Sequence, residues 1–366
     1  MQAESPDCQA TPAKVWGFQP LVAQATEAAY GAAYGLANHR AARPDRYSHT
    51  MIGMYRTMAK TSRERPRRPR ELQDSLNHYL YHPLAWRLAR ALAPTPVTPN
   101  MVSVLGGLFV VAAGIVYWRG PVWGLAWPWA PLLGMMLHMT WHVVDGADGD
   151  LARLTGRSSP MGELIDGICD YASHVVLYVL LVVILAPSLG WGWAWFWALA
   201  AGASHIAQAN FVEVQRRFYQ YWTYGVPWLN NATQADAALF KDKRGVSWIL
   251  RGFVLGYLRL ASGMSPNALT IDAAVSRAIA ADRAGDGTAL AQIRAEVQRE
   301  QRPLLFMLKF LGPNPRAIVL GIAMLIGSPL WYFVYQSLAL NALLYVAVRR
   351  EDAAAMRVVN RLELAR

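Results

Sequence analysis

Asp145-Gly-Ala-Asp148-Gly-Asp-Leu-Ala-Arg153 lies between two hydrophobic stretches of the chain, and Asp166 and Asp170 follow in the second stretch. Asp145 and Asp148 are three residues apart, and Asp166 and Asp170 are four apart, so on a helix each pair shares a face. A carboxylate beside hydrocarbon is costly unless a positive charge neutralises it. Divalent cations take oxygen ligands, so this stretch predicts a metal site at a membrane edge that acts on phosphate.

The composition also indicates a membrane protein. Of the 366 residues, 54% are hydrophobic, only 16% are charged, and 15 are Trp, whereas soluble domains carry about 25% charged residues. The net charge of +11 suits an anionic leaflet, because the basic residues flank apolar segments. We therefore expect membrane lipids, and no nucleic acid, as partners. Cys8 and Cys169 are the only cysteines, and we expect neither a structural disulfide nor a cleaved signal peptide.

Hydropathy predicts an all-α integral membrane protein with six transmembrane helices. Each candidate segment approaches the roughly 20 apolar residues that a bilayer requires. The segments are residues 101–118, 122–144, 165–187, 191–211, 317–331 and 332–348.

Charged and aromatic residues predict the orientation of these spans. Tryptophans cluster in the turns 119–129 and 188–195, where an aromatic belt would mark one interface. Basic residues cluster at the other ends of the spans, in 56–70, 216–251 and 349–366. By the positive-inside rule, both termini and the acidic stretch face the cytoplasm. We expect a multi-pass protein of a bacterial-type inner (plasma) membrane.

The segments outside the spans complete the predicted domain organisation. Leucines recur every four residues from Leu76 to Leu92, which predicts an N-terminal interfacial amphipathic helix. A polar stretch between spans four and five predicts a large cytoplasmic insertion. The predicted parts are an N-terminal extension (1–70), the interfacial helix (71–97), a catalytic transmembrane core (98–211), the insertion (212–316), spans five and six (317–348) and a cytoplasmic tail (349–366).

The residues around the acids favour a two-metal phosphate site. If the second span continues through Asp145 and the third begins near residue 165, the two acid pairs can oppose each other and clamp two Mg²⁺ or Mn²⁺ ions. Gly149, Ala152 and Gly162 remove bulk where a ligand or a neighbouring helix comes close. Arg153 is placed to meet a phosphate or to pair with an acid. We expect Asp150 to face solvent.

The full pattern resembles a known signature. Asp145-x2-Asp148-Gly149-x2-Ala152-Arg153-x8-Gly162-x3-Asp166-x3-Asp170 is similar, at all eight specified positions, to the motif of the CDP-alcohol phosphotransferase (CDP-alcohol phosphatidyltransferase) family. Thr98-Pro99-Asn100, ahead of the first span, also resembles this family. The resemblance does not extend to residues 1–70 or 212–316.

This resemblance implies a homodimeric six-helix enzyme of phospholipid biosynthesis. Such an enzyme moves a substituted phosphate group from a CDP-alcohol donor to a hydroxyl acceptor, which is a lipid or a polyol, and releases CMP. It implies that the four motif aspartates hold two divalent cations and that Asp170 is also the general base. It places Gly149, Ala152, Arg153 and Gly162 beside the cytidine diphosphate.

The acceptor stays open at this point. The stretch 158–170 resembles choline and ethanolamine phosphotransferases, yet those members usually carry a histidine where Gly167 stands. The stretch 71–100 resembles members that use inositol phosphate. Asn210, Glu213, Arg216 and Arg217 are candidates for a phosphorylated acceptor or for a cytoplasmic anchor. Among the histidines of the spans, His142 lies one turn before Asp145; such residues are usually helix–helix hydrogen-bond partners.

A carboxylate-lined divalent-cation transporter is the alternative. Transporters also place acids in membrane helices, but their acids usually lie near mid-membrane and often in duplicated halves. This chain has one acidic stretch, at the cytoplasmic end of its spans, and no internal repeat. The residues therefore favour the enzyme.

Overall fold

The computed structural model of the protein describes residues 69–226, 263–282 and 287–364. Within these ranges it contains helices and turns and no strand, which confirms the predicted all-α class for this part of the chain. The N-terminal extension, apart from residues 69–70, and part of the predicted insertion lie outside the described residues.

A run of short helices precedes the first long one. The 3₁₀ helix Arg70–Leu72 and the π-helix Asn77–Tyr81 lead into α3, His82–Leu92. Ala85 and Ala89 of α3 are fully buried in a core cluster with residues of α4 and α5. The inner face of α3 therefore packs on protein, and its position along a membrane surface stays a prediction.

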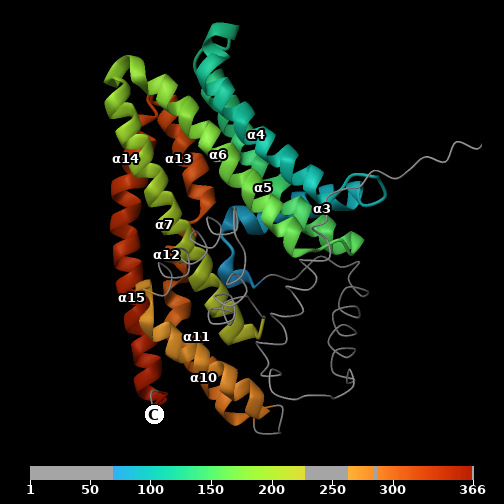
Figure 1. Ribbon diagram of the computed structural model, residues 1–366, viewed down its shortest axis with the longest axis vertical. Coiled ribbons are helices and arrows are strands. Elements are labelled where there is room, and N and C mark those ends of the chain that lie inside the picture. Colours follow the sequence, from blue (N-terminus) through green and yellow to red (C-terminus); the bar gives the residue numbers. More distant parts are fainter. Residues whose placement is uncertain (1–68, 227–262, 283–286, 365–366) are drawn as a thin grey trace, which may run out of the picture. The chain divides into compact units, whose positions relative to one another are not determined.

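Four long helices form the first half of the bundle: α4, Pro99–Arg119, α5, Trp129–Thr155, α6, Pro160–Leu189, and α7, Trp191–Tyr224. Figure 1 shows α4, α5 and α6 side by side, and α5 and α6 both pack against α4. Buried aliphatic and aromatic side chains fill the space between these four helices and α13 and α14. This packing fixes the ends of α5 and α6 that carry the acids.

The C-terminal part contains six further helices. A 3₁₀ turn, Arg302–Leu304, lies between α11 and α12, and a π-helix, Tyr335–Ala339, lies between α14 and α15. The helices are α10, Pro266–Asp282, α11, Thr288–Gln301, α12, Leu305–Phe310, α13, Pro313–Leu325, α14, Leu330–Val334, and α15, Leu340–Arg361.

Several helix ends differ from the sequence prediction. α5 begins at Trp129 and not at residue 122, because residues 120–123 form a 3₁₀ turn that closes at Gly124, whose φ is 83°. α7 continues beyond residue 211 to Tyr224. The last two apolar segments are separated at residues 326–329 and not after residue 331.

Four helical stretches are long and apolar enough to cross a membrane, which fits a multi-pass membrane protein. They are Pro99–Trp123, Ile165–Leu189, Thr288–Leu325 and Leu330–Arg361. α5 and α7 are not among them; α5 carries the acidic stretch, and α7 carries polar residues such as Gln208 and Glu213. The six-span arrangement therefore stays a prediction.

The described part of the predicted insertion is helical. α10 and α11 pack against the C-terminal ends of α7 and α15 (Figure 1). The Trp222 indole N–H donates to Asp272 Oδ1 at 3.0 Å, and Asn267 Nδ2 donates to both carboxylate oxygens of Asp352 at 3.0 Å. Arg357 pairs with Glu300 at 2.6 Å. These contacts tie the insertion to the helices that flank it.

Candidate active site

The acidic stretch lies on one unbroken helix. α5 continues through it to Thr155, so Asp145 and Asp148 project from the same face. Gly156 ends α5 in the left-handed conformation, with φ of 66°, which glycine adopts without steric cost.

A capping serine starts the helix that carries the other two acids. Ser159 Oγ accepts a hydrogen bond from the Gly162 N–H at 3.1 Å, and Pro160 occupies the first turn of α6. Both features are typical of a helix start. The short loop between α5 and α6 thus sets Asp166 and Asp170 opposite the acids of α5.

Asp145, Asp148 and Asp166 form a three-carboxylate cluster, in which one oxygen of each lies within 4.8 Å of the others. Asp148 is buried and the other two are half-buried. Asp166 Oδ1 is buried and has no hydrogen-bond partner among the residues that the structure describes. Three carboxylates this close repel one another, and an all-oxygen donor set suits a hard divalent cation such as Mg²⁺ or Mn²⁺. The residues present therefore fit the metal that the motif implies.

Asp170 lies beside the three-carboxylate cluster and is held by other contacts. Its Oδ1 accepts a hydrogen bond from the Trp141 indole N–H at 2.9 Å. Its main-chain oxygen lies 2.8 Å from His174 Nδ1. Its carboxyl group also lies within hydrogen-bonding reach of Asp145. The structure thus brings the four motif acids together, with Asp170 at the edge of the group.

Ser103 of α4 fixes one of the clustered carboxylates. Its hydroxyl donates to Asp148 Oδ2 at 2.5 Å in a buried contact. A neutral donor of this kind orients a carboxylate without competing with a cation for it. A serine within an apolar span gives no sequence signal for such a role, so Ser103 is not among the predicted site residues.

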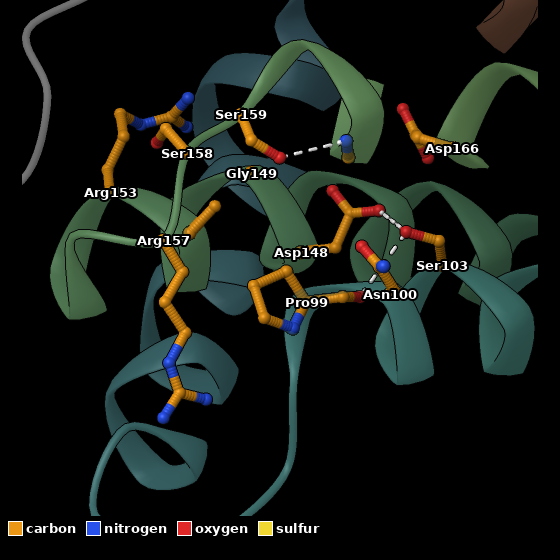
Figure 2. Close-up of a pocket in the computed structure, with 12 residues that line it drawn as sticks. Pro99, Asn100, Ser103, Asp148, Gly149, Arg153, Arg157, Ser158, Ser159 and Asp166 are labelled. Atoms are coloured by element: carbon orange, nitrogen blue, oxygen red, sulfur yellow. Dashed lines mark hydrogen bonds between the residues drawn. The ribbon is translucent and has the colours of Figure 1, made fainter. Parts of the chain in front are cut away.

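The three-carboxylate cluster opens onto a pocket between the ends of α4, α5 and α6. Figure 2 shows Asp148 and Asp166 at one end of it and Arg153 and Arg157 at the other. Four motif residues without carboxylates, namely Gly149, Ala152, Arg153 and Gly162, all line it, together with Pro99, Asn100, Ser103, Arg157, Ser158 and Ser159. Asp145 and Asp170 are not among the lining residues.

Arg153 lies across the end of α5 and pairs with Asp150. Asp150 is only 3% exposed, so the expectation that it faces solvent is wrong. The reason is the spacing, because a side chain three residues further along a helix can reach back and cover it. A Cβ at Gly149 would lie 3.4 Å from Arg153 Nη1, so glycine leaves room for the guanidinium.

The membrane histidines gather behind the acids. The ring of His138 contacts those of His142 and His174, and all three contact Trp141, with ring centroids 4.5 to 6.3 Å apart. His142 stacks on Tyr81 at 5.0 Å. No hydrogen bond from His142 to an acid is found among the described residues, and its position fits packing between α5 and the π-helix that precedes α3.

Two arginines proposed for an acceptor are engaged on their own helix. Arg216 and Arg217 of α7 both pair with Glu213, at 2.8 and 2.5 Å. Ion pairs of this kind between neighbours on a helix are common on helix surfaces. The contacts favour the anchor interpretation over a phosphate site at this place.

Together, the apolar helices and the acidic pocket define a multi-pass helical membrane protein with a site suited to divalent metals. Residues 96–239 match the model of the family described as CDP-alcohol phosphatidyltransferase. The match covers less than half of the chain but includes the whole acidic motif, and it confirms the resemblance of this motif to the family.

Two similar proteins are an ethanolamine phosphotransferase and a choline/ethanolamine phosphotransferase. Ethanolaminephosphotransferase 1 of Pongo abelii is 30% identical over 114 residues, which are 29% of this chain and 28% of that protein. Choline/ethanolaminephosphotransferase 1 of Arabidopsis thaliana is 32% identical over 97 residues, which are 26% of this chain and 25% of that protein. The chain thus spans about a quarter of the length of these relatives.

Proposed function

We propose that the protein transfers a substituted phosphate group from a CDP-alcohol to an acceptor hydroxyl, with release of CMP. The observation that carries the proposal is the three-carboxylate cluster at one end of a pocket lined by the motif residues Gly149, Ala152 and Arg153. The match of residues 96–239 to the CDP-alcohol phosphatidyltransferase model supports the same reaction. It also favours an enzyme over a cation transporter.

Each acid has a proposed part in the site. Asp145, Asp148 and Asp166 would hold one Mg²⁺ or Mn²⁺ ion, and Asp170 would complete the site for a second. The bound cations would screen the phosphates and stabilise CMP as the leaving group. Because Ser103 and Trp141 hold one oxygen each of Asp148 and Asp170, the carboxylates need little rearrangement to bind metal.

The transfer balances as a single displacement. The acceptor oxygen forms a bond to the β-phosphorus of the donor, and the bond from this phosphorus to the bridging oxygen breaks. CMP leaves with the bridging oxygen, and the hydroxyl proton passes to an oxygen of Asp170. Arg153 would hold the cytidine diphosphate, while Gly149, Ala152 and Gly162 leave space for it.

The named relatives suggest which substrates to test first. Their names specify ethanolamine and choline, so we propose CDP-ethanolamine or CDP-choline as donor and a lipid with a free hydroxyl as acceptor. Gly167 stands where aminoalcohol members usually carry a histidine, so CDP-diacylglycerol with a polyol acceptor is the alternative pair.

CMP release tests the proposed reaction. We expect the purified chain in lipid nanodiscs with Mn²⁺ or Mg²⁺ to release CMP from one of these donors, and chelation by EDTA to stop the release. A chain that releases no CMP from any donor–acceptor pair with either metal is not this enzyme. Uptake of Mn²⁺ into vesicles that depends on Asp148 would then favour the transporter.

Replacing Arg153 by Gln should weaken donor binding. The guanidinium borders the pocket, and a hydrogen bond to a charged group contributes about 1.5–3 kcal/mol. We therefore expect the KM for the CDP-alcohol to rise about tenfold or more, with a smaller change for Arg153→Lys. Arg119→Gln is the control, since Arg119 stacks on Trp118 at the other end of α4. An unchanged KM would show that Arg153 only neutralises Asp150.

We also propose that the pocket faces the cytoplasm of a bacterial-type plasma membrane and that the protein is a homodimer. The basic residues near the pocket, Arg153 and Arg157, support this orientation. A cysteine placed at the exposed Ser158 should react with a membrane-impermeant maleimide only in inside-out vesicles. Light scattering of the protein in detergent should give twice the mass of one chain.

A further inference from the structure

One neutral side chain donates a hydrogen bond to the acid that lies outside the three-carboxylate cluster. Trp141 is on α5, one helical turn before Asp145, and is 7% exposed. Its indole N–H reaches across to α6 and donates to Asp170 Oδ1 at 2.9 Å. Apart from the neighbouring carboxyl of Asp145, the described residues give the Asp170 side chain no other hydrogen-bond partner, so the indole is its one neutral donor.

Several neighbours fix the indole itself. Its ring lies 4.5 Å from the ring of His142 and 4.6 Å, edge-on, from that of His174. On the side of α4, Gly106 leaves it room, since a Cβ there would lie 3.4 Å from Trp141 Cδ1. A side chain packed on three sides keeps one rotamer, so its N–H is a fixed donor.

His174 holds the same acid by the main chain. Its Nδ1 lies 2.8 Å from the Asp170 oxygen one turn earlier on α6, and its ring contacts Trp141. The tryptophan thus fixes the side chain of Asp170, and the histidine packs against the tryptophan. Because Oδ1 accepts the indole N–H, Oδ2 is the oxygen that this bond leaves for other partners.

We propose that Trp141 is a positioning residue that presents Asp170 Oδ2 to the metal and acceptor side of the site. The inference rests on the proposed function for its effect on turnover, but it concerns a contact of this chain's own residues. An indole donor removes the freedom of the carboxylate to rotate without adding a charge that would repel a cation. Loss of the N–H should therefore loosen Asp170 while the three-carboxylate cluster keeps its place.

An isosteric replacement tests the N–H alone. Benzothienylalanine, introduced at position 141 by amber suppression, keeps the bicyclic shape and replaces N–H by sulfur. We expect kcat to fall about 10- to 100-fold, the usual loss when an outer-shell partner of a metal ligand is removed. The KM for the CDP-alcohol should stay within about twofold, since Trp141 does not line the pocket. The kcat of Trp141→Phe should fall by the same factor or more, because the smaller ring also leaves a gap in the packing.

Mn²⁺ affinity is a second measurement, which should not change if Trp141 only fills space in the core. Titration of the chain with Mn²⁺, followed by electron paramagnetic resonance, should show one site unchanged and the second weakened in the benzothienylalanine variant. Trp86→Phe is the matched control, since Trp86 is also buried but lies on α3 with no acid bonded to it among the described residues. It should keep both sites and full turnover.

The outcomes separate this inference from the proposed function. Wild-type turnover and Mn²⁺ binding in the benzothienylalanine variant would overturn the role of Trp141. If the wild-type chain releases no CMP, the proposed function fails; a weakened second Mn²⁺ site in the variant would still support the positioning role. Equal losses in the Trp86 control would point to general destabilisation and would also overturn it.

Discussion

Asp148→Asn should lower the rate of CMP release at least about 10³-fold, because the substitution removes a ligand charge that screens the phosphates in the transition state; about 4 kcal/mol of barrier corresponds to this factor. Asp148 both joins the three-carboxylate cluster and lines the pocket. The asparagine keeps the shape of the side chain and can still accept the Ser103 hydrogen bond, so the fold should survive. The measurement is CMP release at saturating donor and Mn²⁺.

The control for this prediction is a carboxylate of the same chain outside the site. Glu300 pairs with Arg357 and Arg361 on α15, and exposed pairs of this kind contribute about 0–1 kcal/mol. Glu300→Gln should therefore release CMP at the wild-type rate. An Asp148→Asn variant as active as Glu300→Gln would contradict the metal assignment.

Mn²⁺ binding should differ between the variants of Asp148 and Asp170. Asp170→Asn should also abolish turnover, but it should retain one Mn²⁺ site, because the three-carboxylate cluster does not include Asp170. Asp148→Asn should weaken that site. Electron paramagnetic resonance of bound Mn²⁺ distinguishes the two variants, and identical spectra would show that the four acids act as one undivided group.

Local rules were sufficient for much of the candidate site. Acids spaced three and four residues apart predict shared helix faces. The predicted start of the third helix near residue 165 was late, because Ser159 and Pro160 begin α6 five residues earlier. Placement of the two pairs opposite each other needs only a short reversal between α5 and α6. The motif and the helical spacing of its two acid pairs therefore predict that the four acids meet at one site.

The contacts that orient the acids lay beyond such rules. Trp141 and Asp170 are far apart in sequence, and they meet because α5 and α6 both pack on α4. Ser103 is an ordinary small residue of an apolar helix until α5 brings Asp148 to it. The expectation for Asp150 failed for a related reason. The sequence of charges along the helix does not show that the Arg153 side chain covers Asp150.

Helix ends were also only partly predictable. Hydropathy marks where a chain can cross a membrane, but a helix ends where its backbone is capped or bent. α7 therefore continues past residue 211 into polar sequence, since nothing there stops it before Gly225, whose φ is 69°. The π-helix Tyr335–Ala339 leaves no mark in the pattern of apolar residues.

Gly134→Leu should destabilise the bundle more than any change at its surface. A Cβ built on Gly134 of α5 falls on the ring of Tyr117, in contact with its Cε1, Cδ1 and Cζ atoms. Tyr117 is 4% exposed, so its ring cannot swing into solvent. Forcing extra atoms into a packed core costs about 1–3 kcal/mol and sometimes more. We expect an equal or larger loss in the free energy of unfolding, measured in detergent by tryptophan fluorescence.

A glycine in open surroundings provides the control. Gly192 of α7 has no atom within 4 Å of a built Cβ, so Gly192→Leu should leave the unfolding free energy nearly unchanged. Shortening Tyr117 should rescue the core variant. The double variant Gly134→Leu with Tyr117→Ala should lose less unfolding free energy than the two single variants together, since the new leucine fills the space of the ring. Additive losses would show that the two residues do not compete for one space.

A smaller substitution at Gly134 should affect the active site through α5. Gly134 and the acids Asp145 and Asp148 lie on one continuous α5, and the Tyr117 contact fixes the distance between α5 and α4. The Ser103 hydroxyl of α4 donates a hydrogen bond to Asp148 of α5. A shift of a few tenths of an ångström between α4 and α5 would lengthen that bond. We therefore expect Gly134→Ala, which is the milder change, to fold and yet to bind Mn²⁺ more weakly than the wild type. Gly192→Ala should bind it normally, and equal Mn²⁺ affinities in the two variants would show that the site tolerates movement of its supporting helix.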